Sequence, residues 1–263
     1  MANFTAKDVQ QLRKNTGAGM MDCKKALEDS DGDFEAAVQL LREKGLAKAG
    51  ARSDRDASQG TVAIAADGNR AALVELKAET DFSAKAEDFV ALVDELAQLV
   101  LAGGEEAVAQ KQTAIEDLNI QKKENISLGK VVRFEAAEGA IIDAYLHRQD
   151  GRGVIGVLLE ATGVDAETLH EIALHAAFAK PRFLRRDEVP AEAAAKERAS
   201  LLEITKAEGK PEAAWEKIVD GRLNSWYGES VLLEQGVHGD KETVAQRIGN
   251  GTITRMAIAV IGG

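Results

Sequence analysis

The sequence has little cysteine, aromatic character or positive charge. Its single cysteine, Cys23, excludes an intramolecular disulfide and a zinc site made of several cysteine ligands. The 33 Lys and Arg residues are outnumbered by 44 Asp and Glu, giving a formal net charge of −11. This balance argues against a protein that binds nucleic acids or anionic membranes through general charge attraction. Aromatic residues make up only 4% of the chain, so aliphatic side chains must supply most packing contacts.

Long apolar runs are also absent. No run approaches the ~20 residues that would span a bilayer, so we expect no transmembrane helix. The first residues, MANFTAKDV, lack the basic flank and apolar stretch of a signal peptide. We therefore expect a cytoplasmic protein that does not bind membranes.

Motifs of common enzyme classes are missing as well. The chain has no P-loop, and Gly249-Asn250-Gly251 precedes the last predicted strand, whereas a dinucleotide fingerprint follows a strand. His170 and His175 lie one residue too far apart for a zinc-protease helix, and each is expected to be a covered helix residue. Cys23 has apolar neighbours at helical spacing, which favours a core thiol over a nucleophile. We expect no enzymatic activity, no cofactor and no metal.

The sequence does contain clear helical periodicity near its start. Three amphipathic segments lie between residues 4 and 45, with Gly17 and Gly45 placed to end the first and third helices. The following segment is small, polar and without periodicity. We expect a three-helix domain over residues 1–50 and a linker over residues 51–60.

A pattern of strand, turn, strand and helix then occurs twice. Asp67-Gly68-Asn69 and Asp150-Gly151-Arg152-Gly153 each separate two strand-like runs, and an amphipathic helix follows each pair. Lys130–Glu135 and Thr252–Ile261 add one further strand each. These patterns predict an α+β protein with two similar subdomains, each a small antiparallel sheet covered by helices. The predicted subdomains are residues 61–139 and 140–263.

A different pattern interrupts the second subdomain. Ala191–Glu208 and Glu212–Trp226 have helical periodicity, and Gly209-Lys210-Pro211 breaks it between them. This order predicts an antiparallel helical hairpin. Because it lies between two strands of one sheet, we expect residues 188–226 to project as an arm.

Two motifs carry a family resemblance. They are LRKNTGAGMMDCKKAL, from Leu12 to Leu27, and ETDFSAK, from Glu79 to Lys85, between a predicted strand and helix. In this order and at this separation they resemble the bacterial elongation factor Ts family. The agreement resumes at AYLHR, IGVLLE, KPRFL and EGKPE…KIVDGRLN, so it covers nearly the whole chain.

The resemblance implies a guanine-nucleotide exchange factor that acts on the GTPase elongation factor Tu. It further implies a first domain similar to ubiquitin-associated (UBA-like) domains, a core of two α+β subdomains and a coiled-coil arm. Elongation factor Tu would be the partner, with no direct binding of nucleotide or nucleic acid. The alternative is a non-catalytic helical binding or scaffold module.

The resemblance also implies which residues act on the partner. Thr80, Asp81, Phe82 and Ser83 match the segment with which family members disturb the partner's Mg²⁺ site. The family usually has Val where Ser83 stands, so we expect looser packing behind Phe82. The residues by themselves leave a structural alternative open, in which Asp81 caps the next helix and Phe82 fills the core.

Contacts in other regions are implied in the same way. Arg13, Met20, Met21 and Lys24 match first-domain positions that face the GTPase, although one methionine is expected to be core. His147 matches a contact to a second region of the partner, and its alternative is a solvated surface imidazole. The C-terminal TRMAIAVIGG departs from the family's usual ending, so no contact is assigned there.

Overall fold

The first part of the chain folds into three short helices around a small core. The computed structural model describes residues 3–262 of the 263, so the outermost ends of the predicted domains, at residues 1–2 and 263, lie outside it. The helices are α1 (Ala6–Thr16), α2 (Met20–Asp29) and α3 (Phe34–Gly50). Their buried residues are Val9, Leu12, Cys23, Ala26, Leu27, Ala37 and Leu41. Burial raises the pKa of the Cys23 thiol, and the prediction of a core thiol is confirmed.

The ends of these helices test the prediction that Gly17 and Gly45 end the first and third helices. Gly17 ends α1 in the left-handed conformation at φ 66°, as predicted, and its N–H donates to the Arg13 carbonyl. The prediction that Gly45 ends the third helix is wrong, because α3 continues to Gly50. A Cβ at Gly45 would lie 2.9 Å from the side chain of Ile120. Gly45 is therefore needed for close packing against the next domain, and that packing offsets the low helix propensity of glycine.

The second part contains the first predicted sheet. Strands β1 (Gln59–Asp67), β2 (Arg70–Ala78) and β3 (Ser127–Glu135) form an antiparallel sheet in the order β1-β2-β3. The tight turn predicted between the first two strands is present, with Asp67 opposite Arg70. The chain then forms α4 (Asp81–Ala84), α5 (Glu87–Gly103) and α6 (Gln112–Lys122). Helix α5 packs against β1 and β2 and covers one face of this sheet.

The third part repeats this arrangement. Strands β4 (Ala140–Gln149), β5 (Arg152–Thr162) and β6 (Thr252–Val260) form a second antiparallel sheet in the order β4-β5-β6. Helix α7 (Ala166–Ala179) packs against β4 and β5, and α10 (Val244–Arg247) precedes β6. Short 3₁₀ helices lie at Glu105–Lys111, Arg186–Glu188, Glu212–Ala214, Leu232–Glu234 and Val237–Gly239. The predicted α+β class with two small antiparallel sheets is confirmed.

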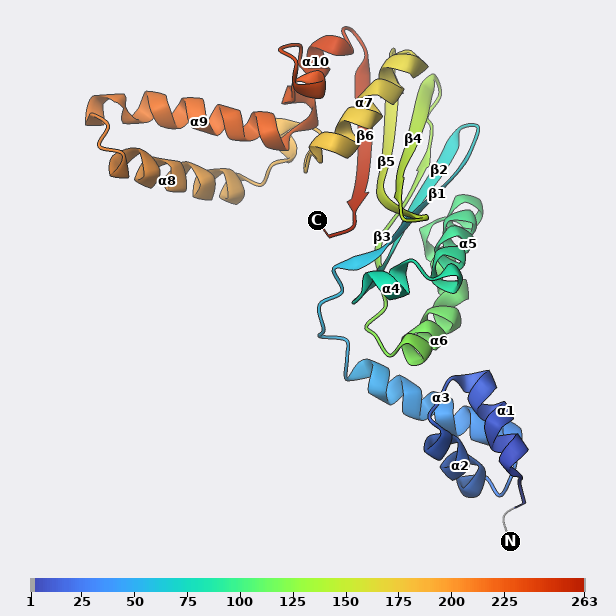
Figure 1. The fold of residues 1–263 in the computed structure, drawn as a ribbon. Coiled ribbons are helices and arrows are strands. Elements are labelled where there is room, and N and C mark those ends of the chain that lie inside the picture. The colour runs from blue at the N-terminus through green and yellow to red at the C-terminus, as the bar shows by residue number, and fades with distance from the viewer. Residues whose placement is uncertain (1–2, 263) are drawn as a thin grey trace.

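The two sheets pack face to face, so helices cover only their outer faces (Figure 1). The shared core consists of Val62, Ala71, Leu73, Phe134, Leu158, Ala257 and Ala259. Glycine permits a close approach of the two sheets, since a Cβ at Gly156 would lie 2.7 Å from the Val62 side chain. The layers are therefore helix, sheet, sheet and helix, and the central strands β2 and β5 are buried on both faces.

A helical hairpin lies between β5 and β6 in sequence. It consists of α8 (Ala191–Ala207) and α9 (Trp215–Ser230), which pack against each other and extend away from the sheets (Figure 1). Arg198 pairs with Glu216 and Asp220 across the hairpin. The predicted hairpin is present. Within residues 3–262 no helix combines the length and apolar character needed to cross a membrane.

Candidate partner-binding site

The connection between β2 and α5 is anchored at both ends. Thr80 is the N-cap of α4, and its hydroxyl accepts a hydrogen bond from the Ser83 N–H at 3.2 Å. At the other end, Ala84 is fully buried and its carbonyl accepts the Thr61 hydroxyl at 2.7 Å. Asp81 and Phe82 lie between these anchors and are exposed. The fold thus fixes the backbone of a turn whose two outer side chains face solvent.

Phe82 projects from this turn instead of filling the core. Its side chain is 74% exposed, whereas Phe89 on α5 is fully buried. The structural alternative for Phe82 is therefore wrong, because Ser83 and Ala84 occupy the inner side of α4. The Lys85 ammonium lies 4.6 Å from the centre of the Phe82 ring. An exposed aromatic ring on a fixed backbone offers apolar area that another protein can cover.

Asp81 is an exposed carboxylate that pairs with Lys85. The Asp81 Oδ2 and Lys85 Nζ atoms are 3.0 Å apart. The hydrogen bond from Lys85 is the main cause that lowers the pKa of Asp81 from its ordinary value, so this carboxylate is ionised at neutral pH. The structural alternative in which Asp81 caps the next helix is also wrong, because Thr80 caps α4 and Ala86 precedes α5.

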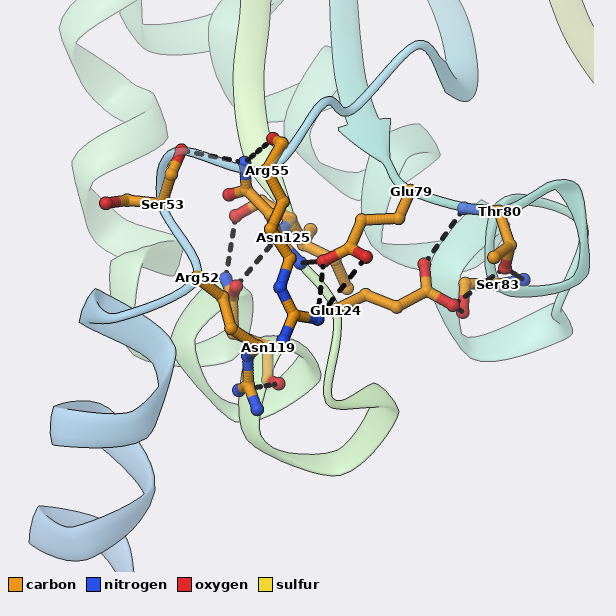
Figure 2. A network of polar contacts seen from close by, with 10 residues as sticks. Arg52, Ser53, Arg55, Glu79, Thr80, Ser83, Asn119, Glu124 and Asn125 are labelled. Carbon is orange, nitrogen blue, oxygen red and sulfur yellow. Dashed lines mark hydrogen bonds and ion pairs between the residues drawn. The ribbon is translucent and has the colours of Figure 1, made fainter.

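Ser83 and Thr80 make polar contacts on the inner side of the turn. Ser83 is buried, and its hydroxyl donates to Glu124 at 2.6 Å. The Thr80 hydroxyl donates to the same carboxylate at 2.7 Å (Figure 2). A valine at position 83 could not donate such a bond. In this chain a hydrogen bond therefore lies behind Phe82.

The first domain exposes the predicted docking residues. Met20 is 44% and Met21 73% exposed, and Lys24 and Arg13 are also on the surface. The expectation that one methionine belongs to the core is wrong, because residues elsewhere on α2 fill the inner face of that helix. Met20, Met21 and Lys24 line a hollow together with residues of α1. Arg13 is not among the residues that line it.

His147 lies near the end of β4 and is exposed. Its Nδ1 atom is 3.5 Å from the Tyr145 hydroxyl. The turn that follows β4 is held beside β1, because Arg152 donates to the carbonyl of Gly60. Gly60 in turn pairs with Lys77 near the end of β2, just before Thr80. The fold thus brings His147 to the same end of the paired sheets as the Thr80–Ser83 turn.

The structure identifies two further residues at the turn. Lys85 follows Asp81 at the helical spacing of four residues, and this spacing in the sequence is sufficient to predict their ion pair. Glu124 comes from the loop between α6 and β3, and nothing in the local sequence indicates that it meets Thr80 and Ser83. Only the tertiary fold brings this carboxylate to the turn.

The histidines of α7 do not form a metal site. His175 is buried, as predicted, and its Nε2 lies 3.1 Å from the Gln235 side-chain oxygen. His170 is exposed and pairs with Asp143, so the expectation of a covered residue is wrong there. Across the described residues, no group of three or more His, Cys, Asp or Glu is placed to hold a metal ion.

Together these features define a class of protein. It is an α+β protein with two small antiparallel sheets that presents an exposed ring and a carboxylate on a fixed turn, and it has a separate exposed surface on its first helices. The family model described as Elongation factor TS matches residues 79–262, beginning at this turn.

Curated relatives extend the match to the first domain. "Elongation factor Ts" of Kineococcus radiotolerans is 41% identical, over 94% of this chain and 94% of the relative. That of Saccharopolyspora erythraea is 42% identical, over 97% and 96%. That of Mycobacterium avium is 43% identical, over 97% and 96%. The chain belongs to the elongation factor Ts family, and the resemblance predicted from its motifs is confirmed.

Proposed function

We propose that this chain, a translation elongation factor by its family, binds elongation factor Tu and promotes release of GDP so that GTP can rebind. The observation that carries the proposal is the exposed Phe82 ring beside the ionised Asp81 on an anchored turn. A flexible loop would lose much of its binding energy to ordering, whereas an anchored turn does not. The turn is therefore suited to act on another protein's structure.

Exchange does not require contact with the nucleotide. A GTPase holds its nucleotide through loop amides, a lysine and a bridging Mg²⁺ on the phosphates. A partner that binds the nucleotide-free form more tightly than the loaded form weakens nucleotide binding by the same factor. We therefore assign Asp81 and Phe82 to disturbing the Mg²⁺ and phosphate site of elongation factor Tu. Thr80 and Ser83 hold the turn that carries them.

The other sites supply binding. We assign Arg13, Met20, Met21 and Lys24 of a UBA-like docking domain, residues 1–50, to a first contact with the GTPase, and His147 to a second. Residues 51–60 link this domain to subdomains 61–139 and 140–263, from which the proposed coiled coil at 188–226 projects. The protein would act in the cytoplasm without a cofactor.

The alternative function is a helical binding or scaffold module. Such a protein would dock through α1 and α2 and would not need an exposed ring on a distant turn. The test adds the chain at substoichiometric concentration to elongation factor Tu loaded with fluorescent GDP and excess unlabelled GDP. We expect each molecule of the chain to release GDP from many GTPase molecules. Binding without faster GDP release would support the scaffold function and overturn the proposal.

A further inference from the structure

The α4 turn needs support from outside itself. It contains four residues, and its ends are closed by the Ala84 N–H to the Thr80 carbonyl at 3.2 Å and the Lys85 N–H to the Asp81 carbonyl at 3.0 Å. Isolated helices shorter than ~12 residues are marginal in water, so one turn does not hold its own conformation. The side chains that bond to the turn therefore decide how Phe82 is presented.

Glu124 makes most of these bonds with a single carboxylate. It accepts the Thr80 N–H at 3.1 Å, the Thr80 hydroxyl at 2.7 Å and the Ser83 hydroxyl at 2.6 Å. Figure 2 shows the Glu124 side chain extended from its loop toward both residues. Bonds to an ionised acceptor are stronger than neutral ones, and here they join both the cap residue and the inner side of the turn.

The backbone beside Glu124 is fixed as well. The N–H of Asn125 donates to Glu79 at 2.6 Å, and its side-chain amide donates to the carbonyls of Ser53 at 3.0 Å and Arg55 at 2.8 Å (Figure 2). Asn125 thereby joins the segment after α3, the end of β2 and its own loop. Glu124 is held on a fixed support, which is what a residue that positions another segment requires.

The contacts of the Glu124 side chain support no other role for it. It pairs with no Lys, Arg or His in the described range 3–262, and it lies beyond the end of α6, which Lys123 closes in the left-handed conformation. Every hydrogen bond of its side chain within that range goes to Thr80 or Ser83.

We propose that Glu124 is a positioning residue that holds the Thr80–Ser83 turn so that Asp81 and Phe82 face the partner. Ser83 supplies one of its three bonds, so the support includes the buried inner side of the turn as well as its cap residue. The inference rests on the exchange function proposed above. Glu124 would act on the rate of exchange through Phe82 and would not contribute to docking by the first domain.

The test compares Glu124→Ala with Glu106→Ala in the full-length protein. The Glu106 side chain is exposed and makes no hydrogen bond or ion pair within the described range, so Glu106→Ala also removes a carboxylate but breaks no contact. We expect Glu124→Ala to lower the maximal rate of GDP release from elongation factor Tu about tenfold. Its half-saturating concentration should stay within about twofold of wild type, and Glu106→Ala should behave as wild type.

A double-mutant cycle with Phe82→Ala separates positioning from general stability. If Glu124 acts through Phe82, Glu124→Ala should have little further effect on exchange in the Phe82→Ala background. Glu124→Gln keeps one acceptor oxygen and should give an intermediate rate. Full additivity, or wild-type exchange by folded Glu124→Ala, would overturn the proposal. If that variant does not fold, Ser83→Ala takes its place, and a wild-type maximal rate would likewise overturn it.

Amide hydrogen exchange on the free protein provides a readout independent of elongation factor Tu. Residues 81–85 should exchange faster in Glu124→Ala than in wild type, while the strands of both sheets keep their protection. If the wild-type chain does not accelerate GDP release, the proposed function is wrong, and this measurement still decides whether Glu124 holds the turn. Unchanged protection at residues 81–85 would refute the positioning role in either case.

Discussion

Phe82 and Phe89 lie on successive helices of one subdomain, yet their surroundings are opposite. Phe89 is on the face of α5 that packs on the sheet, and its ring is fully buried with residues such as Leu92 and Leu96. Phe82 is on a single turn whose inner side is taken by Ser83, and its ring is 74% exposed. The same residue type thus stabilises the fold at one position and is free for a partner at the other.

The largest effect on folding should come from the buried ring. Phe89→Ala would leave a cavity in the core of the first subdomain and should lower the free energy of unfolding by about 3–5 kcal/mol. Denaturant unfolding followed by circular dichroism measures it. Exchange of GDP per folded molecule should remain near wild type. A small loss of stability would show that the core tolerates the cavity. Phe89 and Phe82 would then not differ in their contribution to the free energy of unfolding.

The exposed ring should show the reverse pattern. Phe82→Ala should change the free energy of unfolding by about 0.5 kcal/mol or less, the usual value for a surface substitution. Assisted GDP release should slow about tenfold for each ~1.4 kcal/mol of lost preference for the nucleotide-free GTPase. Asp81→Ala should act in the same direction, and the double variant should be non-additive because both side chains share one turn.

Unfolding midpoints and exchange rates must be measured on the same three variants. A large drop in the midpoint of Phe82→Ala, with unchanged exchange by the folded fraction, would contradict the proposed role of this ring.

The contrast between these two rings shows what sequence can predict here. Periodicity predicted the amphipathic helix that carries Phe89, and the turn patterns predicted both hairpins and the arm. Neither pattern predicts whether Phe82 is buried, because the four residues of α4 are too few to show helical periodicity. The residues alone left its role open, and only the family resemblance favoured exposure.

The errors share one physical cause. Gly45 was expected to end a helix, but contact with Ile120 of a distant element overrides its low propensity. Glu124 was missed because its partners are far away in sequence. One of the two methionines, Met20 or Met21, was expected to be core, but other residues of α2 fill its inner face and both methionines are exposed. Tertiary contacts decide each case.

Residues 1–50, like Phe82, are expected to serve binding and not the stability of the two sheets. Deleting residues 1–50 should leave the two-sheet core folded, since the core clusters of both subdomains contain none of these residues. The half-saturating concentration for GDP release should rise about tenfold or more, because exposed Met20 and Met21 are lost from the interface. If the truncated protein exchanges nucleotide as well as the intact chain at limiting concentration, the docking role is wrong.

Buried His175 should make stability depend on acid. Its Nδ1 accepts the His238 N–H at 3.1 Å and its Nε2 donates to Gln235, so the neutral ring satisfies both contacts. Burial is the main cause that lowers the pKa of His175 from its ordinary value of about 6.5, and the neighbouring His238 also lowers it. A lowered pKa in the folded state gives stability that is present above pH 6.5 and is lost as the pH falls below it.

Unfolding free energies measured between pH 7 and pH 5 test this expectation. The decline with acid should be smaller in His175→Gln than in wild type, because the variant has no ring to protonate. Phe82→Ala keeps His175 and should retain the wild-type slope. Equal slopes in His175→Gln and wild type would show that other groups cause the acid sensitivity.

The smallest effect on the core should come from removing the arm. None of the residues 191–226 belongs to the apolar cluster between α7 and its sheet, and the buried Thr205 and Val219 lie on α8 and α9 themselves. Replacing residues 191–226 with a Gly/Ser linker should therefore keep one cooperative thermal transition, with a midpoint within about 5 °C of wild type. Calorimetry measures both quantities. An aggregated product or a broad transition would mean that the arm stabilises the sheets. The arm would then contribute to folding, as Phe89 does, and would not be dispensable for folding, as Phe82 is expected to be.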